Sequence, residues 1–274
     1  MPDTDNQEPV DLGVELAKTG RKRQISLRAI TPNLVTLLAL CAGLTSIRLA
    51  MEQRFEFAIF AMVLAAILDG LDGRVARLLK STSKFGAELD SLTDFVNFGV
   101  APGMILYLWM LHELKSLGWI AALVFAICAA LRLARFNVAI ADKPDEPTPS
   151  WKDNYFSGVP APAGALCVML PLYLQKIGIP ITSDWAVPVM IYVLAIGLLL
   201  VSTLPTFSGK TMGSKVPREF ALLLMVGLVL VVALLASYPF IVVTVLTLLY
   251  LATLPLGARA YKKKMAAEML PPST

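Results

Sequence analysis

Four aspartates lie at the facing ends of two consecutive apolar segments, and their types and spacing are those of a chemical site. Asp69 and Asp72 are three residues apart near the end of one segment, and Asp90 and Asp94 are four apart near the start of the next. Each spacing places two side chains on one face of a helix. A carboxylate costs about 2.5–3.5 kcal/mol at a bilayer centre, so acids inside the membrane indicate function. These four are expected near the interface, where the cost is lower, so their spacing and not the cost carries the prediction.

Facing carboxylates on neighbouring helices predict bound metal. Four of them would repel one another, and some would have to stay protonated unless cations lay between them. Two divalent ions would balance the four negative charges. Carboxylate oxygens are the ligands that Mg²⁺ and Mn²⁺ prefer, and substrate phosphate commonly completes their coordination. The sequence therefore predicts a site for two Mg²⁺ or Mn²⁺ ions.

Small residues accompany the acids. Gly70, Gly73, Ala76 and Gly86 lack side-chain bulk, so a nucleotide or diphosphate can approach the backbone there. Arg77 offers a planar fork of donors to phosphate. Close helix packing would explain the glycines alone, but it does not explain the acids.

Long apolar segments must position these residues. The chain of 274 residues is 57% hydrophobic and 16% charged, whereas about a quarter of an average soluble protein is charged. Segments long enough to cross a bilayer occur at about 31–50, 55–79, 86–111, 118–140, 159–176, 186–206, 219–236 and 238–257. The predicted fold is an all-α, polytopic membrane helix bundle with about eight transmembrane helices.

The positions of the cations predict the orientation of the bundle. With the N-terminus inside, 20 of the 24 lysines and arginines fall in cytoplasmic segments, which is a strong positive-inside signal. Both termini and the acidic site are then expected on the cytoplasmic side. The net charge of +4 fits contact with anionic membrane lipid and requires no nucleic-acid partner.

Three regions are expected along the chain. Residues 1–30 form a cytoplasmic segment with a candidate interfacial helix, and their polar composition predicts no secretory signal. Residues 31–257 form the membrane domain, with Thr31 as N-cap and Pro32 in the first turn of its first helix. Residues 258–274 form a cytoplasmic tail.

The spacing of the aspartates, glycines, Ala76 and Arg77 resembles the motif of the CDP-alcohol phosphatidyltransferase family. All nine motif positions between Asp69 and Asp94 match, and such a pattern is far more specific than a glycine motif alone. The resemblance implies that Asp69, Asp72 and Asp90 bind metal. Asp94 would be the general base close to the metals. The CDP-diacylglycerol site would contain Asp69, Gly73, Ala76, Arg77 and Gly86.

Several stretches resemble the bacterial branch of the family that uses L-serine as acceptor; they are 83–92, 98–102, 132–137 and 156–162. This implies a bacterial inner-membrane enzyme that converts CDP-diacylglycerol and L-serine to phosphatidylserine and CMP. Arg132 and Arg135 share a helix face, and either could hold the serine carboxylate or anchor the helix at the interface. Glycerol 3-phosphate and inositol or its phosphate remain alternative acceptors.

Other assignments stay open. A transporter would place acids near the midplane and tends to have repeated halves, and a non-catalytic scaffold would lose a motif aspartate; the sequence shows none of these features. Gly99 and Gly103 could let helices approach closely within the bundle or between protomers. Family likeness implies a homodimer. The roles of loops 141–157 and 208–218 are undetermined, although the second is basic enough to suit phosphate.

Overall fold

The computed structural model describes residues 27–79, 83–141, 155–207 and 218–268, and these are mostly helical. The expectations for residues 1–26 and for most of loops 141–157 and 208–218 lie outside the described residues. Each of the eight predicted apolar segments is largely helical in the structure. Within the described ranges, four helical segments are both long and apolar enough to cross a membrane by themselves: Thr31–Met51, Ser116–Ala139, Ser183–Val201 and Pro239–Tyr261.

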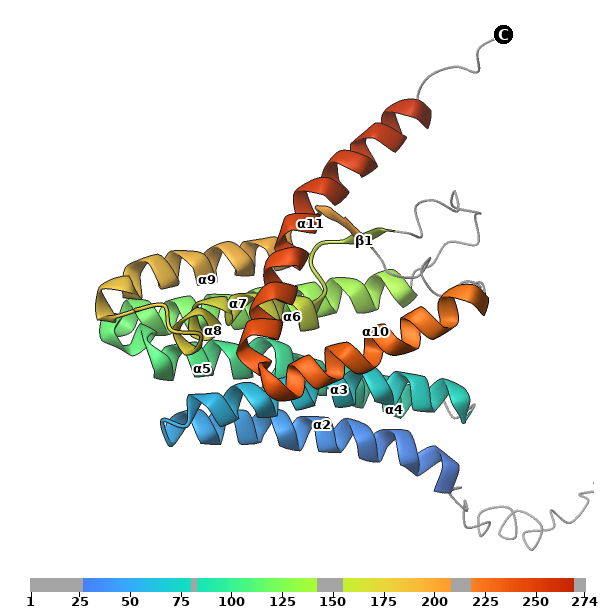
Figure 1. Cartoon of the computed structure of the whole chain (residues 1–274), viewed down its shortest axis with the longest axis horizontal. Coiled ribbons are helices and arrows are strands. Elements are labelled where there is room, and N and C mark those ends of the chain that lie inside the picture. Colours follow the sequence, from blue (N-terminus) through green and yellow to red (C-terminus); the bar gives the residue numbers. More distant parts are fainter. Residues whose placement is uncertain (1–26, 80–82, 142–154, 208–217, 269–274) are drawn as a thin grey trace, which may run out of the picture.

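The first two helices run side by side along one edge of the molecule (Figure 1). Helix α2 spans Leu27–Met51 and α3 spans Phe55–Leu78. The prediction that α2 begins at Thr31 is wrong, because the helix starts at Leu27 and Pro32 lies inside it. Pro32 is the sixth residue of this helix. It therefore removes one hydrogen bond, the one from its own position to the carbonyl oxygen four residues earlier.

The third predicted segment is a composite of three helical pieces. Helix α4 spans Lys84–Asp94, a π-helical turn η1 spans Phe95–Val100, and α5 spans Ala101–Trp109. Ser83 caps α4, because its hydroxyl accepts a hydrogen bond from the Gly86 amide at 3.0 Å. Such a cap stabilises a helix by about 1 kcal/mol. It fixes the start of the helix that carries Asp90 and Asp94.

Gly99 and Gly103 allow close packing inside the bundle. A short 3₁₀ helix η2, Leu111–Leu114, leads into α6, Ser116–Ala141. A Cβ atom on Gly103 would lie 3.2 Å from the Ala122 carbonyl oxygen, and one on Gly99 would lie 3.1 Å from the Ala129 Cβ. The two glycines therefore bring η1 and α5 against α6 of the same chain.

A two-stranded ladder modifies the all-α prediction. Strands β1, Tyr155–Ser157, and β2, Pro205–Phe207, pair antiparallel, with Phe156 opposite Thr206. As a result the sixth apolar segment ends earlier than predicted: α9, Ala186–Val201, stops before β2 instead of continuing to residue 206. The Thr206 hydroxyl donates to the Gly158 carbonyl oxygen at 2.8 Å, which ties the ladder to the chain entering the fifth segment.

The remaining helices complete the bundle. The fifth segment breaks at Met169 into α7, Ala161–Val168, and α8, Leu170–Lys176. A 3₁₀ turn η4, Ser183–Trp185, precedes α9. Helix α10 spans Arg218–Ser237, and α11 spans Pro239–Glu268, continuing into the predicted tail. Figure 1 shows α11 crossing the other helices and extending away from them at its C-terminal end.

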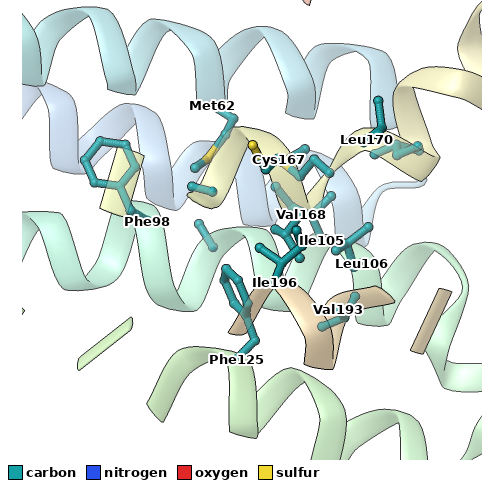
Figure 2. Packing of buried hydrophobic residues seen from close by; sticks show 14 of the residues in the cluster. Met62, Phe98, Ile105, Leu106, Phe125, Cys167, Val168, Leu170, Val193 and Ile196 are labelled. Carbon is teal, nitrogen blue, oxygen red and sulfur yellow. The ribbon is translucent and has the colours of Figure 1, made fainter. Parts of the chain in front are cut away.

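The core lies between α3, α5, α6, α7 and α9. Figure 2 shows Met62, Phe98, Phe125 and Cys167 converging there from different helices. Many large apolar side chains elsewhere are exposed, for example Leu64 at 50% and Ile191 at 59%. An outer surface of this kind suits lipid, because hydrocarbon has no tendency to expel apolar side chains.

Candidate functional site

Three of the four predicted aspartates converge at one point between α3 and α4. Carboxylate oxygens of Asp69, Asp72 and Asp90 all lie within 4.8 Å of one another. The helical spacing predicted from the sequence produces this arrangement, because each helix presents its acids to its neighbour. Three oxygens at this separation fit a divalent cation, which takes carboxylate oxygens at about 2.0–2.6 Å.

Asp94 joins the cluster through Asp69. The two side chains are within hydrogen-bonding distance, and two carboxyl groups can share a hydrogen bond only if one of them carries a proton. Asp69 Oδ1 and Asp94 Oδ1 are each buried without a partner among the described residues. Buried acceptors without donors are unfavourable. The predicted metal set therefore fits as a group, because cations would satisfy these oxygens.

Asp72 is the most enclosed of the four. Only 4% of its surface is exposed. The Thr36 hydroxyl of α2 donates to Asp72 Oδ2 at 2.7 Å. A hydrogen bond to a charged group contributes about 1.5–3 kcal/mol, so Thr36 holds Asp72 in one orientation.

A cavity of about 190 Å³ opens beside the acids. Gly73, Ala76 and Gly86, which the sequence assigns to CDP-diacylglycerol, line it together with Asp72 and Asp90. A Cβ atom on Gly73 would meet no atom of the described residues within 4 Å. The missing side chains therefore leave space at the acids, as a diphosphate would require.

Sequence reasoning missed the contribution of α2 to this cavity. Its wall includes Pro32, Asn33 and Thr36. The Asn33 amide lies close to Gly86, since a Cβ atom there would be 3.0 Å from Asn33 Oδ1. Asn33 and Thr36 are polar residues three apart in an apolar segment, so they lie on one helix face. This spacing could have identified them in the sequence as candidate residues of the site.

The predicted phosphate ligand Arg77 lies at the end of α3 and not in the cavity wall. Its side chain is exposed, and its Nε donates to the Gly73 carbonyl oxygen at 3.0 Å. This bond ties the base of the guanidinium to the backbone beside the acids. The preceding residue, Ala76, lines the cavity, so Arg77 starts next to the cavity wall in the chain.

The two predicted serine ligands on α6 have different surroundings. Arg132 is partly buried, and its Nε donates to the Val159 carbonyl oxygen at 2.7 Å. Arg135 is exposed, and its Nη1 donates to the Val201 carbonyl oxygen at 2.7 Å. Although they share a helix face, the two arginines bond to different segments of the chain.

Comparison with known proteins agrees with this geometry. The family model for CDP-alcohol phosphatidyltransferases matches residues 29–201, and a second, CDP-alcohol phosphatidyltransferase 2, matches residues 219–255. The first match contains all four aspartates, both arginines of α6 and the cavity wall.

Curated relatives cover most of the chain. A protein of Mycobacterium leprae is 42% identical over 236 residues, which are 85% of this chain and 76% of the relative. One from Mycobacterium tuberculosis is 38% identical over 249 residues, 90% of this chain and 84% of the relative. One from Methanocaldococcus jannaschii is 37% identical over 183 residues, 61% of this chain and 80% of the relative. All three are named CDP-diacylglycerol–serine O-phosphatidyltransferase.

Proposed function

Because this chain belongs to the CDP-alcohol phosphatidyltransferase family, we propose that it transfers the phosphatidyl group of CDP-diacylglycerol to L-serine, giving phosphatidylserine and CMP. The observation that carries the reaction type is the cluster of Asp69, Asp72 and Asp90. Two of these acids, Asp72 and Asp90, lie in the wall of a cavity that glycine and alanine also line. The names of the mycobacterial relatives support serine as the acceptor.

Asp94 is the proposed general base. It lies beside Asp69 and on the stripe of Asp90, one helical turn away. The serine hydroxyl would pass its proton to Asp94 as its oxygen bonds to the phosphorus that carries diacylglycerol. The bond from that phosphorus to the CMP oxygen then breaks, and CMP leaves with the electron pair. A free carboxylate, with a pKa near 3.9, is a weak base for an alcohol, so positioning must supply much of the rate.

The acids and the small residues would have different roles in binding CDP-diacylglycerol. Asp69, Asp72, Asp90 and Asp94 are the proposed ligands of two Mg²⁺ or Mn²⁺ ions, which would neutralise charge on the phosphoryl oxygens when bound. Gly73, Ala76 and Gly86 give the diphosphate access to the backbone, and Arg77 would add a charged donor. The carboxylate of serine would bind at Arg132 or Arg135.

We propose that the enzyme spans the bacterial inner membrane eight times, with both termini and the acids at the cytoplasmic face. The distribution of cations supports this orientation. The acyl chains of the donor would then stay in the bilayer while the head group enters the cavity. The homodimer implied by family likeness remains a prediction, which chemical crosslinking in native membranes would test.

Purified protein tests the proposed function directly. CMP release is measured with CDP-diacylglycerol, Mg²⁺ or Mn²⁺, and separately L-serine, glycerol 3-phosphate, inositol or inositol phosphate. We expect serine to drive CMP release and EDTA to stop it. Release driven by another alcohol and not by serine would reject the acceptor while leaving the transferase chemistry in place.

A further inference from the structure

Helix α6 packs along η1 and α5 through pairs of small residues. Gly103 lies against Ala122, where an added Cβ atom would be 3.2 Å from the carbonyl oxygen. Gly99 lies against Ala129, where the added atom would be 3.1 Å from the alanine Cβ. Residue numbers fall along one segment as they rise along the other, so the two run antiparallel. Because α4 directly precedes η1, the same packing leads from α6 to the helix that carries the second pair of acids.

Further along this face, α6 meets α4 through a polar pair. The side-chain amide of Asn137 on α6 donates to the Ser91 hydroxyl oxygen on α4 at 3.0 Å. Asn137 follows Ala129 by eight residues, so the two share one helix face. Ser91 donates its own proton to the Ala87 carbonyl oxygen at 3.0 Å, which leaves its oxygen free to accept from Asn137. A side-chain bond of fixed direction therefore joins the two helices.

This bond connects the helix of the proposed base with the helix of the proposed acceptor ligands. Ser91 precedes Asp94 by three residues on α4, and Asn137 follows Arg132 by five residues on α6. The Arg132 Nε donates to the Val159 carbonyl oxygen at 2.7 Å. The same part of α6 is thus bonded both to α4 and to the chain that enters α7. Two separate bonds therefore set where this part of α6 lies relative to the acids.

We propose that the bond between Asn137 and Ser91 positions the acceptor for the reaction, by setting how far the arginines of α6 lie from the base on α4. The inference rests on the proposed function, in which the acceptor carboxylate binds at Arg132 or Arg135 and its hydroxyl faces Asp94. Neither Ser91 nor Asn137 lies in the wall of the cavity beside the acids. Both are positioning residues, and a reactant misplaced by about 1 Å can lose about 100-fold in rate.

The substitutions Asn137→Ala and Ser91→Ala test this role, because each removes the bond. For both we expect turnover with L-serine to fall about 10-fold, while the KM for CDP-diacylglycerol changes by less than about twofold. Turnover is expressed per molecule of CDP-diacylglycerol bound in the presence of metal, so a loss of folded protein does not count as a loss of rate. The apparent Tm in detergent should change by less than about 4 °C, since one exposed hydrogen bond adds little stability.

Three further variants make the test specific. Ser91→Thr keeps a hydroxyl at this position and should retain most of the parent turnover. Thr45→Ala is the matched control: the Thr45 hydroxyl donates to the Cys41 carbonyl oxygen of its own helix at 2.6 Å, as Ser91 does to Ala87, and its loss should leave turnover unchanged. Combining Ser91→Ala with Asn137→Ala should cost no more turnover than either substitution alone, because both remove the same bond.

Any of three results would overturn the inference. Normal turnover in both alanine variants would show that the bond does not position the acceptor. Turnover that falls only in step with donor binding would leave the bond a purely structural role. A loss in Asn137→Ala without a loss in Ser91→Ala would place the amide on the substrate itself. Each presumes a parent enzyme that uses serine; a parent that does not use it rejects the proposed acceptor, and the two failures are thereby distinguished.

Discussion

The four aspartates differ in their surroundings, and this separates their expected roles. Asp72 is enclosed and held by Thr36, whereas Asp90 lies in the cavity wall. Asp69 and Asp94 face each other, and each has one buried oxygen without a partner in the described structure. An acid that must move a proton needs access to the substrate and freedom from a fixed donor. Asp94 meets the second condition better than Asp72.

The substitution Asp94→Asn is expected to reduce turnover by at least about 100-fold, because a positioned base contributes about 10²–10⁴ in rate. Fold and metal-dependent binding of CDP-diacylglycerol should remain, since the amide keeps the size of the side chain. CMP release at saturating serine measures turnover, and binding of labelled CDP-diacylglycerol in the presence of metal measures donor binding. Near-normal turnover in this variant would remove Asp94 from the role of base.

The substitutions Asp69→Asn and Asp90→Asn should instead raise the metal concentration needed for activity. Each removes a negative charge from the group of three oxygens within 4.8 Å, and affinity for hard cations falls with the number of charged ligands. Activity titrated with Mn²⁺ after chelator treatment gives the measurement. Asp184, an acid on η4 outside the cluster, provides the control as Asp184→Asn. Identical titrations for all three variants would exclude Asp69 and Asp90 as ligands.

At the scale of elements, the site depends on interruptions in helices that look continuous in sequence. The π turn η1 directly follows Asp94, and such turns are frequent at functional sites. Asn97 within it is fully buried against Gly43 of α2, where a Cβ atom would overlap the amide. The glycines of α2, η1 and α5 therefore set how closely η1 and α5, which directly follow the helix of Asp90 and Asp94, pack against α2 and α6.

The substitution Gly118→Ala tests packing at the other end of the bundle. Its Cβ atom would lie 1.8 Å from the Leu111 carbonyl oxygen, so the backbone joining η2 to α6 must shift. Overpacking of this kind typically costs about 1–3 kcal/mol. We expect a lower apparent Tm in detergent, with an unchanged metal titration because the acids are distant in the chain.

Gly227→Ala on α10 is the matched control. Within the part of the chain that the structure describes, a Cβ atom there meets nothing within 4 Å, and alanine favours a helix by up to about 1 kcal/mol over glycine. The Tm of this variant should stay level or rise. Equal losses in both variants would show that the Leu111 contact does not limit stability.

At the scale of the whole molecule, the orientation of the bundle is the open prediction. Four helical segments of the described ranges meet the criteria for crossing a membrane alone. The other four predicted spans are the continuous helices α3 and α10 and two segments that are broken into shorter pieces. Helices α4, η1 and α5 together, or α7 and α8 together, approach the length of a span. Eight crossings would return the C-terminus to the side of the N-terminus.

Single cysteines placed in loop 141–157 and after residue 258 should react with an impermeant thiol reagent only from the cytoplasmic side. The three native cysteines are free, and Cys41 is exposed, so they are replaced first. A cysteine introduced at Lys115, between η2 and α6, is the control expected to react from outside. Labelling of either cytoplasmic position in intact cells would contradict the eight-span count and the charge rule behind it.

The sequence by itself determined the helical segments, the two stripes of acids and the family. These features depend on local order: apolar length, a 3.6-residue period, and residue types at fixed separations. Asp69, Asp72 and Asp90 could be placed together because a short connection makes consecutive helices neighbours.

Only the tertiary structure decided which distant residues complete the site. The bond from Thr36 to Asp72 and the approach of Asn33 to Gly86 join different helices. Helical periodicity predicts which residues share one face of a helix, but it does not predict which other helix packs against that face. No local pattern in the sequence therefore specifies these pairs. The three-residue ladder of β1 and β2 was missed for the same reason, because its strands are short and pair across almost 50 residues.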